Sequence, residues 1–454
     1  MKRIISLFII ISICLSFVSC NFNAPTINGI SVKKYRIVYD AEGLDYNLRA
    51  AEYIRDEIKE RSGVELEIVD DSAEKREFEI VVGETSREIS AQLDAECEGL
   101  EFAMLVRDGS VALEADYFII AAAAYYFIDT YVFESGYAIT LEDGESVHKP
   151  ITRKAKNFIM LIGDGMGFYH TQSFEYMKNN TEFSDGEDFF YGYLLPYQGE
   201  SRTDSLDGTT DSAAGGTALS CGQKTHNNFV GIDKNGKDIK SLTELAYDKG
   251  MSAGVMSTEV DTGATPASFS AHADSRHSIA GIVLSQMNSI EYYGTNIDCG
   301  YDYYTADGIV TIEEHITEML GTLGQNEKGF FLMYEEAHID KHSHQNDVNS
   351  MFQSVVRFNQ AIARFMEYAF YNPETFILIT ADHETGDLYP GASGALTYHS
   401  DAHTSKNVPI FAYGMGAELF DGKNVENIQI AHTIASLMGE DNFGDQSKYQ
   451  RLNK

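Results

Sequence analysis

The chain is organised around Thr209-Thr210-Asp211-Ser212-Ala213-Ala214-Gly215-Gly216. Small residues continue to Ala218, and this run predicts the first turns of a helix that packs closely against its neighbours. Ser212 would then lie at a helix N-terminus, where unpaired backbone N–H groups and the helix dipole favour an anion. That field alone does not turn a serine hydroxyl into a nucleophile at ordinary pH, so the rest of the chain must supply a stronger activating group.

The first twenty residues have the pattern of an export signal. Lys2 and Arg3 precede an apolar run over residues 4–17, and small residues then lead to Cys20. The run is shorter than a stable membrane span and is typical of a secretory signal. Residues 1–20 also resemble a bacterial lipoprotein signal peptide. That resemblance implies a lipid on Cys20 and an exported protein anchored to a membrane, on its periplasmic or cell-surface side; simple secretion and an uncleaved anchor are the alternatives.

The 454-residue chain has a formal charge of −35. So acidic a surface repels nucleic acid and anionic lipid heads, and we therefore expect no nucleic-acid binding and no membrane contact apart from the lipid. If the substrate is an anion, bound metal must provide the attracting field. The cysteines that follow Cys20 are Cys97, Cys221 and Cys299, which show no metal-binding spacing and allow at most one disulfide.

Sequence patterning divides the remainder into several segments. They are a tether at residues 21–30, a small α/β domain of unknown role at 31–148, a catalytic domain at 155–440 and a C-terminal tail at 441–454. The small domain is predicted from strand-like alternation, from a helical pattern stopped by Gly63 and from Asp108-Gly109, a strong hairpin signal. It holds no cluster of acids, histidines or exposed aromatic residues that demands a site, which favours a packing or spacing role.

The predicted catalytic domain alternates strands with helices. Strand patterns occur at 158–162, 253–257, 330–334, 376–380 and 408–413, and helical patterns at 242–249, 351–370 and 428–438. This order predicts an α/β fold with a mainly parallel, doubly wound sheet flanked by helices. Ligands of such sheets bind at the carboxyl ends of the strands, so the residues that follow each strand are the candidates for a site.

Acidic residues and histidines cluster near these strand ends. In chain order they are Asp164, Glu335, Asp340, His344, Asp382, His383 and His403. One aspartate after one strand is commonly a turn residue, so it is their convergence on one sheet edge that predicts a metal site. Asp340 and His344 are four residues apart and would point the same way from a helical turn, but His338 and His342 have the same spacing. Geometry alone leaves that choice open.

These motifs make residues 155–440 similar to the alkaline phosphatase family. The matching segments, all in the order of the family, are Gly163-Asp164-Gly165-Met166-Gly167, Thr210-Asp211-Ser212-Ala213-Ala214, Ala264-Thr265-Pro266-Ala267, Ser275-Arg276, Glu335 with Asp340 and His344, Thr380-Ala381-Asp382-His383, and His403-Thr404. The resemblance implies a hydrolase of phosphate monoesters with two zinc ions and one magnesium ion. A homodimer is compatible with it.

The resemblance also assigns a role to each matching residue. It places Asp340, His344 and His403 on the first zinc, Asp164, Asp382 and His383 on the second, and Asp164, Thr265 and Glu335 on magnesium. Ser212 is the matching nucleophile, which would form a phosphoserine intermediate. Arg276 would grip the phosphate oxygens and be held in place by Asp211. Lys341 could reach the phosphate through water or lie solvated at the surface, and His338 and His342 would line the site.

Two departures from the family pattern have consequences. Gly263 stands where the family commonly has Asp or His, so the magnesium site loses a partner, although a glycine also lets another group or a water approach. Only nineteen residues, 384–402, separate His383 from His403, where several members insert a subdomain. We therefore expect a compact catalytic domain with an open site.

Three functions other than a phosphatase are possible for such a sequence: a phosphodiesterase, a sulfatase and an inactive binding protein. A phosphodiesterase of the same superfamily is the main alternative, although Thr265, Glu335 and Arg276 argue against it. A sulfatase requires a Cys/Ser-x-Pro-x-Arg motif, which the segment starting at Ser212 does not match. An inactive, lipid-anchored binding protein would not need the full set of metal ligands.

Overall fold

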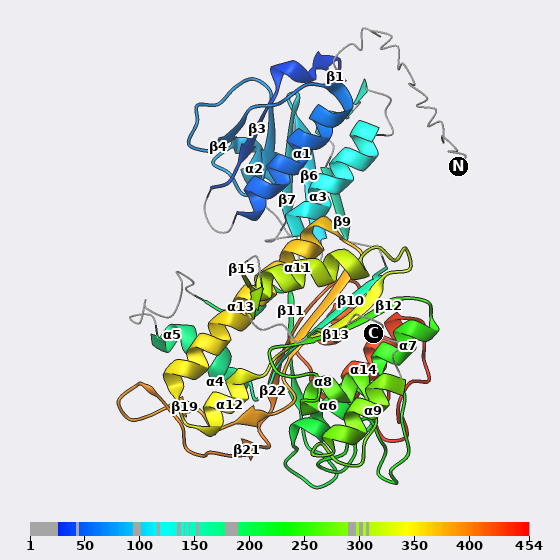
Figure 1. The fold of residues 1–454 in the computed structure, drawn as a ribbon. Coiled ribbons are helices and arrows are strands. Elements are labelled where there is room, and N and C mark those ends of the chain that lie inside the picture. Colours follow the sequence, from blue (N-terminus) through cyan, green and yellow to red (C-terminus); the bar gives the residue numbers. More distant parts are fainter. Residues whose placement is uncertain are drawn as a thin grey trace, which may run out of the picture. The chain divides into compact units, whose positions relative to one another are not determined.

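The computed structural model describes residues 26–41, 45–93, 101–115, 119–133, 138–139, 141–144, 146–150, 154–177, 189–288, 297–298, 303–305 and 308–453. They divide into two compact units with the main boundary between Val147 and His148, and short stretches within 101–103 and 115–122 group with the second unit. Figure 1 shows the first unit in blue to cyan. The predicted signal with Cys20, and also Cys97 and Cys299, lie outside the described residues.

The first unit contains a six-stranded sheet. Its strands, in spatial order, are β4 (Ile68–Asp70), β3 (Arg36–Tyr39), β5 (Glu79–Val82), β7 (Ser110–Ala115), β6 (Glu101–Arg107) and β9 (Ser146–Pro150). Its helical segments are η1 (Val32–Lys34), α1 (Tyr46–Ser62), α2 (Glu88–Leu93), α3 (Ile120–Tyr126) and the π-helix η3 (Phe127–Phe133). Asp108 and Gly109 both have positive φ between β6 and β7, as the hairpin signal predicted.

The segment predicted as a tether is partly built into this unit. Within 21–30 the structure describes residues 26–30, which contribute to β1 (Thr26–Ile27) and β2 (Ile30–Ser31). These strands form a small sheet with β8 (Ala138–Ile139), to which β1 is parallel. Residues 26–27 and 30 of the predicted tether are therefore strand residues in the structure.

A buried ion cluster connects several segments of the first unit. The Glu79 carboxylate accepts hydrogen bonds from Arg36 Nε at 2.9 Å and from Arg87 Nε at 2.8 Å, and all three side chains are buried. Arg87 also donates to the backbone oxygens of Asp71 and Ala73. Because these donors are used within the domain, the cluster fits a structural role better than ligand binding.

The second unit is built on an eight-stranded sheet. In spatial order its strands are β13 (Ile297–Asp298), β12 (Ser252–Ser257), β16 (Phe330–Glu336), β10 (Asn157–Gly163), β17 (Thr375–Thr380), β22 (Val408–Tyr413), β11 (Tyr197–Arg202) and β23 (Asn424–Glu426). Neighbours from β13 to β17 pair in parallel, whereas β22 is antiparallel to both β17 and β11. The mainly parallel sheet predicted from the sequence is therefore confirmed, with β22 reversed.

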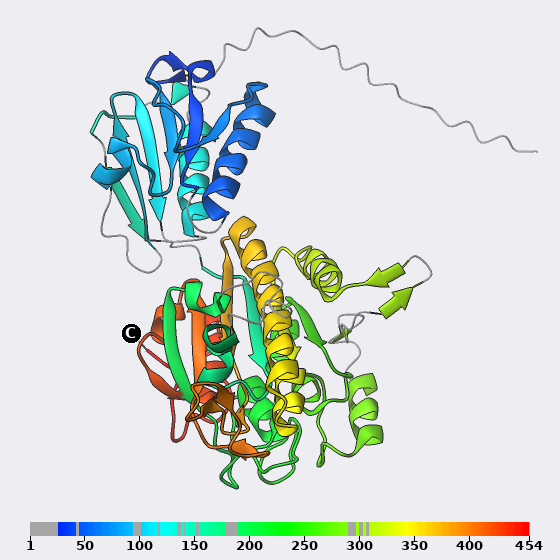
Figure 2. The ribbon, with the colours of Figure 1, turned by 90° about the vertical axis from the view of Figure 1, so that its left-hand side faces the viewer.

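Helices cover both faces of this sheet (Figures 1 and 2). The long helix α13 (Val348–Tyr371) packs on one face, against β10, β16 and β17. The other face is covered by α6 (Ser212–Cys221), α7 (Leu242–Asp248), α8 (Ala264–Ser270) and α14 (Asn427–Leu437). The remaining segments are α4 (Phe168–Thr171), α5 (Ser173–Met177), η4 (Tyr191–Leu194), α9 (Ile279–Asn288), β14 (Tyr303–Thr305), β15 (Gly308–Val310), α11 (Ile312–Leu323), α12 (His338–His344), β18 (Glu384–Thr385), β19 (Tyr389–Pro390), β20 (Leu396–Thr397), β21 (His403–Thr404) and η5 (Ala417–Leu419).

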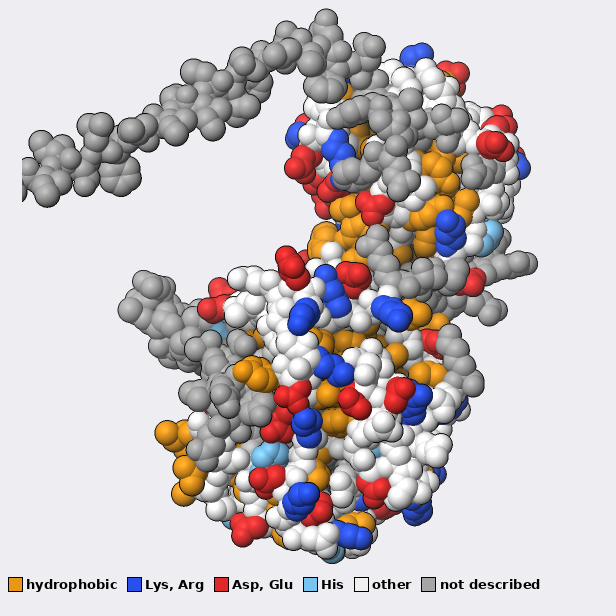
Figure 3. All heavy atoms as spheres, turned by 90° about the vertical axis from the view of Figure 1, so that its right-hand side faces the viewer, with side chains coloured by type: hydrophobic (Ala, Val, Ile, Leu, Met, Phe, Trp, Pro, Cys, Tyr) orange, Lys and Arg blue, Asp and Glu red, His pale blue; other side chains and the backbone are white. Residues whose placement is uncertain are grey.

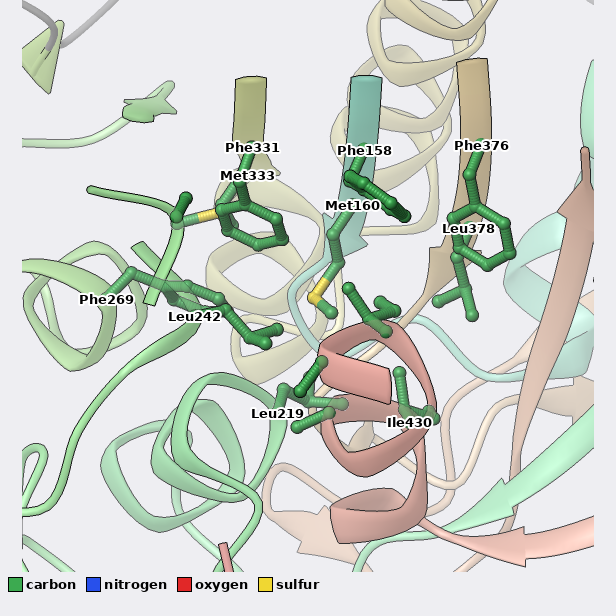
Figure 4. Close-up of a cluster of buried hydrophobic side chains, with 14 of the residues drawn as sticks. Phe158, Met160, Leu219, Leu242, Phe269, Phe331, Met333, Phe376, Leu378 and Ile430 are labelled. Carbon is green, nitrogen blue, oxygen red and sulfur yellow. The ribbon is translucent and has the colours of Figure 1, made fainter. Parts of the chain in front are cut away.

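Apolar side chains of the central strands hold the helices in place. In Figure 4, Phe158 and Met160 of β10 point toward the helices beside the pairs Phe331–Met333 and Phe376–Leu378 of the adjacent strands. Burying each side chain of this size contributes about 1.5–3 kcal/mol. This packing fixes α6, and with it Ser212, against the sheet.

The C-terminal tail predicted at 441–454 packs against this core. Phe443 is buried in it and Leu452 lies against it. Gln429 of α14 donates to the backbone oxygen of Gln450 at 2.7 Å.

The described surface of the second unit carries charges of both signs. On the face drawn in Figure 3, Lys and Arg side chains alternate with Asp and Glu, so the acidic excess of the chain is not concentrated there. None of the helices in the part of the chain that the structure describes has the length and apolar character needed to cross a membrane.

Candidate active site

The direction of each strand brings the candidate residues to one edge of the sheet. Strands β10, β16 and β17 are parallel and in register, so Asp164, Glu335 and Asp382 all lie at or just beyond the same ends. His403 precedes its strand instead of following it. It reaches the same edge because β22 is antiparallel and therefore starts where the others end.

Asp340, His344 and His403 form the first candidate metal group. Nε2 of His344 lies 3.0 Å from Nε2 of His403, and these atoms are 3.4 and 3.5 Å from Oδ1 of Asp340. Asp340 and His344 lie one turn apart on α12, as their spacing predicted. Three ligand atoms thus converge on one point from two distant segments.

Hydrogen bonds on the far side of each ring determine what the two nitrogens can do. Nδ1 of His344 lies 2.6 Å from the backbone oxygen of Asp401, and Nδ1 of His403 lies 2.9 Å from that of Thr210. A carbonyl oxygen only accepts, so each Nδ1 carries the proton and each Nε2 has a lone pair. Two lone pairs cannot hydrogen-bond each other across 3.0 Å, and a cation between them satisfies both.

Asp164, Asp382 and His383 form the second candidate group, and all three are buried. Nε2 of His383 lies 3.5 Å from Oδ1 of Asp164 and 3.3 Å from Oδ2 of Asp382. Neither of those carboxylate oxygens has a hydrogen-bond partner among the residues that the structure describes. Buried charged oxygens without partners are costly, and a divalent cation would compensate them.

Thr385 fixes the tautomer of His383 and links the two groups. Its hydroxyl donates to Oδ1 of Asp340 at 2.5 Å, so it can only accept from Nδ1 of His383, 3.2 Å away. Nε2 of His383 therefore carries a lone pair as well, directed at the carboxylates and at the hydroxyl of Ser212, 3.2 Å away. The rings of His383 and His403 stack with their centroids 3.6 Å apart, so the two groups are adjacent.

Gly165 allows this close approach. Its φ of +75° lies in the left-handed region, and a Cβ there would come within 2.9 Å of Cα of Asp340. Any side chain would therefore push the loop that carries Asp164 away from α12. The glycine of the motif thus holds the two groups together.

Burial and mutual repulsion shift the titration of these groups. Burial raises the pKa of Asp382 to about 7, and the nearby Asp340 adds to the rise. Burial and the charges of Asp382 and Asp340 raise the pKa of Asp164 well above its usual range. For His383, burial and then the neighbouring His403 lower the pKa, which keeps the ring neutral. The site therefore disfavours its own negative charge unless a cation is present.

The metal-free protein should show this repulsion as a pH effect on stability. Asp382 has a folded-state pKa of about 7 and an unfolded value near 4, so between these pH values the folded state binds a proton that the unfolded state has lost. Its contribution to stability therefore falls as pH rises from about 4 to about 7. We expect metal-free Asp382→Asn to be more stable than the metal-free wild type at pH 8, by on the order of a few kcal/mol, and similar to it near pH 4.

Urea unfolding of both proteins in the presence of chelator measures this difference. Added Zn²⁺ should reverse its sign, because the ion requires the ionised carboxylate that the variant lacks. A difference in stability that does not change with pH would show that Asp382 is ionised in the metal-free site.

Thr265 and Glu335 lie buried at the edge of the site. Oε2 of Glu335 accepts from the Ser257 hydroxyl, while Oε1 of Glu335 and Oγ1 of Thr265 have no partner within the described ranges apart from the interaction between these two side chains. Burial, and then the charge of Glu259, raise the pKa of Glu335 well above its usual range. Two oxygens of this kind, both of hard ligand type, suit a cation such as Mg²⁺.

Asp211 and Ser212 have the positions that the sequence predicted for them. Asp211 caps helix α6, with Oδ1 accepting from the N–H of Ala214 at 3.0 Å, and Ser212 is the first helical residue. Oδ2 of Asp211 accepts from Nη1 of Arg276 at 3.2 Å and from the N–H of Asn228 at 3.0 Å. The carboxylate thus fixes both the start of the helix and the guanidinium beside it.

The alternative pair on α12 does not join the metal groups. Nδ1 of His338 lies 3.4 Å from Oε1 of Glu336, and Nδ1 of His342 lies 3.1 Å from the hydroxyl of Ser354 on α13. The two pairs of residues with this spacing, Asp340 with His344 and His338 with His342, thus lie on different faces of the same helix. Only the face with Asp340 turns toward His403.

Two further residues at the site gave no signal in the sequence. Thr385 fixes His383, and only its place two residues after that histidine could have indicated it. Glu259 lies in the turn between β12 and α8, where its Oε2 accepts from Nζ of Lys341 at 2.7 Å. The sequence left two interpretations of Lys341 open, a contact with phosphate through water or a solvated position at the surface; in the structure its Nζ pairs with this carboxylate.

The fold and the site together define an α/β enzyme whose carboxylate and imidazole groups are placed for metal ions beside a serine at a helix start. Residues 155–295 and 305–394 match the family model described as alkaline phosphatase. The chain therefore belongs to the alkaline phosphatase family and is a phosphoric monoester hydrolase, and the family is metal-dependent.

Relatives and solved structures agree with this assignment. Alkaline phosphatase 4 of Bacillus subtilis is 30% identical over 350 residues, 65% of this chain and 75% of that protein. Alkaline phosphatase 3 of the same organism is 31% identical over 324 residues, 60% of this chain and 70% of that protein. The structure of alkaline phosphatase from the Antarctic bacterium TAB5 superposes with a TM-score of 0.53 at 26% identity, covering 63% of this chain and 99% of that one. The first unit lies outside the residues matched by the family model.

Proposed function

We propose that the chain hydrolyses phosphate monoesters through a phosphoserine intermediate on Ser212. The observation that carries this proposal is the contact between the Ser212 hydroxyl and Nε2 of His383, a nitrogen whose lone pair is fixed by Thr385. A serine buried beside two groups of metal-ligand atoms, at the start of a helix, is placed to lose its proton and to attack an anion.

The donor sets fit two zinc ions and a third ion, which the oxygen ligands of the third site suit to magnesium. Asp340, His344 and His403 would hold one zinc and Asp164, Asp382 and His383 the other, since mixed imidazole and carboxylate ligands suit zinc. Asp164, Thr265 and Glu335 offer oxygen alone, which suits magnesium. When bound, such ions lower the pKa of an attached hydroxyl and stabilise charge on the attacking and leaving oxygens. A solved structure of a TAB5 enzyme mutant has Mg bound in a third site, which supports three ions here.

The protein's own groups perform the remaining tasks. Ser212 supplies the attacking oxygen and forms the bond to phosphorus as the alcohol leaves. Arg276 can donate two N–H groups to phosphate oxygens, and its pairing with Asp211 holds the guanidinium in one orientation. The second half of the reaction breaks the serine–phosphate bond with water and regenerates the hydroxyl.

Variants of Asp211 and Arg276 can distinguish the effect of the geometry of the guanidinium from the effect of its charge. Arg276→Lys keeps the charge but loses the two-pronged contact, so kcat/KM for a monoester should fall about 10–100-fold, and inhibition by inorganic phosphate should weaken in parallel. Asp211→Asn keeps the acceptor for the cap but loses the ion pair and turns an amide NH2 toward the N–H of Asn228, so kcat/KM should fall roughly tenfold and Tm should also fall. Steady-state kinetics and thermal unfolding measure both. Unchanged inhibition by phosphate in Arg276→Lys would remove Arg276 from the phosphate site.

Comparing substrates tests the reaction class. We expect an aryl phosphate monoester to be cleaved with a much higher kcat/KM than the corresponding bis-aryl diester, and with release of inorganic phosphate. Faster cleavage of the diester would favour the phosphodiesterase alternative.

The export signal and the lipid complete the proposal. The apolar run at 4–17 that ends at Cys20 supports an exported protein anchored through that cysteine. Mass spectrometry of the mature N-terminus would identify a lipid-modified Cys20, and an unmodified residue there would argue for simple secretion.

A further inference from the structure

We propose that Glu259 supplies a carboxylate to the third cation site, in the space that Gly263 leaves free. This inference rests on the proposed third ion at Thr265 and Glu335, and it concerns a residue that no sequence motif assigns. Four observations carry it: the position of the Glu259 carboxylate, its link to Glu335, its pairing with Lys341 and the buried oxygens beside it.

The first observation is the contact between Glu259 and Gly263. A Cβ built on Gly263 would lie 2.0 Å from Oε1 of Glu259 and 2.3 Å from its Cδ, so the carboxylate fills the volume that a side chain would take. Gly263 has φ −56° and ψ 154°, an ordinary extended conformation that does not require glycine. The reason for a glycine at 263 is therefore steric, and the group that needs the space is Glu259.

The second observation is the connection from Glu259 to Glu335. The Ser257 hydroxyl donates to Oε2 of Glu335 and accepts from the backbone N–H of Glu259 at 3.0 Å. One hydroxyl thus orders the turn that carries Glu259 and the carboxylate at the end of β16. Gly263 is two residues before Thr265 at the start of α8, so the same turn leads from Glu259 to the threonine.

The third observation is the charge of Glu259 and its surroundings. Its side chain is only 16% exposed and pairs with Nζ of Lys341 at 2.7 Å. Oε1 lies on the other side of that pair, toward Gly263. A carboxylate held in this way retains acceptor capacity on the oxygen that does not bind the lysine.

The fourth observation is the unmet need for positive charge. Oε1 of Glu335 and Oγ1 of Thr265 are fully buried and, apart from the interaction between these two side chains, lack partners within the residues described. A hard divalent cation bound to them would be favoured by a further carboxylate in direct or water-mediated contact. Glu259 thus replaces the side chain that Gly263 lacks, so the third ion keeps an acidic partner that comes from four residues earlier in the chain.

Magnesium binding to the zinc-loaded full-length protein tests the inference. Isothermal titration calorimetry with Mg²⁺ should show an affinity about 10–100-fold weaker for Glu259→Gln than for the wild type. The amide has nearly the same shape, so Tm with zinc but without magnesium should be unchanged. Glu374→Gln is the matched control, because it removes the same charge from a Glu–Lys pair, with Lys156 at 3.1 Å, at the opposite edge of the sheet.

Moving the carboxylate back to position 263 provides a second test. Gly263→Asp alone should weaken Mg²⁺ binding, because the new side chain collides with Glu259 and adds a like charge. In the double variant Glu259→Ala/Gly263→Asp the collision is removed and a carboxylate is restored, so the affinity should recover most of the loss. If the losses of Mg²⁺ affinity caused by Glu259→Ala and by Gly263→Asp simply add in the double variant, the inference is overturned.

A variant of Lys341 should change the Mg²⁺ affinity in the opposite direction. Lys341→Met removes a positive charge beside Glu259, so Mg²⁺ should bind as tightly as in the wild type or more tightly, opposite to Glu259→Gln. Weaker binding in both would mean that the ion pair supports the fold rather than the ion, and would overturn the inference. If the wild type takes up no third ion, the proposed third site is overturned as well. If the wild type binds Mg²⁺ and Glu259→Gln binds it with the same affinity, only the role of Glu259 is overturned.

Discussion

Ser212→Ala should lower kcat for an aryl phosphate by about three orders of magnitude or more. The variant loses the hydroxyl that lies 3.2 Å from Nε2 of His383 and with it the covalent route. Binding of the phosphate group should change much less, since the guanidinium of Arg276 and its partner Asp211 are untouched. The loss should therefore fall on kcat rather than on the inhibition constant of inorganic phosphate.

Acid quenching of the reaction with radiolabelled substrate makes the test specific. The wild type should retain label on a peptide that contains Ser212, and Ser212→Ala should retain none. Ser220→Ala is the matched control, because Ser220 lies in the same helix, is also buried, and among the described residues its hydroxyl contacts the backbone oxygen of Thr217 and Sγ of Cys221, neither of which belongs to the site. It should keep both activity and label. A labelled peptide in Ser212→Ala, or activity within tenfold of the wild type, would place the nucleophile elsewhere.

The sequence predicted the strand ends of this site because parallel strands leave a simple signature. Asp164 and Asp382 follow runs of buried apolar residues, and such runs arise where a strand is covered by helices on both faces. The direction of β22 was not visible in the same way. An apolar strand reads alike in both directions, so the reason for the position of His403 emerged only with the sheet.

Strand β11 and the contact between Glu259 and Gly263 could not be predicted from the sequence, for a different reason. Strand β11 has the sequence Tyr-Gln-Gly-Glu-Ser-Arg, without the alternation or the apolar run that marks a strand, and it owes its structure to pairing with β22 and β23. Glu259 contacts Gly263 through a turn whose course depends on backbone bonds to Ser257 and Glu335. Neither spacing nor composition specifies such a turn.

The role of Lys341 shows where a motif stops being informative. Its position after Asp340 identifies the residue but not its partner, which is a carboxylate from another element. A solvated lysine, a lysine that contacts phosphate and a lysine in an ion pair with a carboxylate can all occur at the same position of one sequence. Only the location of Glu259 distinguishes them, and that location depends on the absence of a side chain at Gly263.

Removal of metal should abolish activity and destabilise the second unit. Dialysis against chelator leaves facing lone pairs on His344 and His403 and unpartnered carboxylate oxygens on Asp164 and Asp382, as far as the described residues show. A ligand at 1,000 times its Kd stabilises a fold by about 4 kcal/mol, so the Tm should fall by several degrees or more. Activity should fall at least a thousandfold, because the hydroxyl of Ser212 then keeps its ordinary pKa.

Adding Zn²⁺ back should restore both activity and stability. A variant of one histidine then tests whether these effects come from zinc bound at the first candidate group. His403→Ala removes one of the three atoms that converge on the first ion, so zinc affinity should drop by about 10–100-fold or more and activity should need far higher zinc. His399→Ala is the matched control, because His399 lies four residues before His403, stacks its ring on Tyr389 and belongs to neither metal group. Metal content by mass spectrometry and Tm against zinc concentration give readouts that do not depend on turnover. Full activity in protein that retains less than one equivalent of metal would contradict the site, because the imidazole and carboxylate groups gathered at this sheet edge would then have no cation to bind.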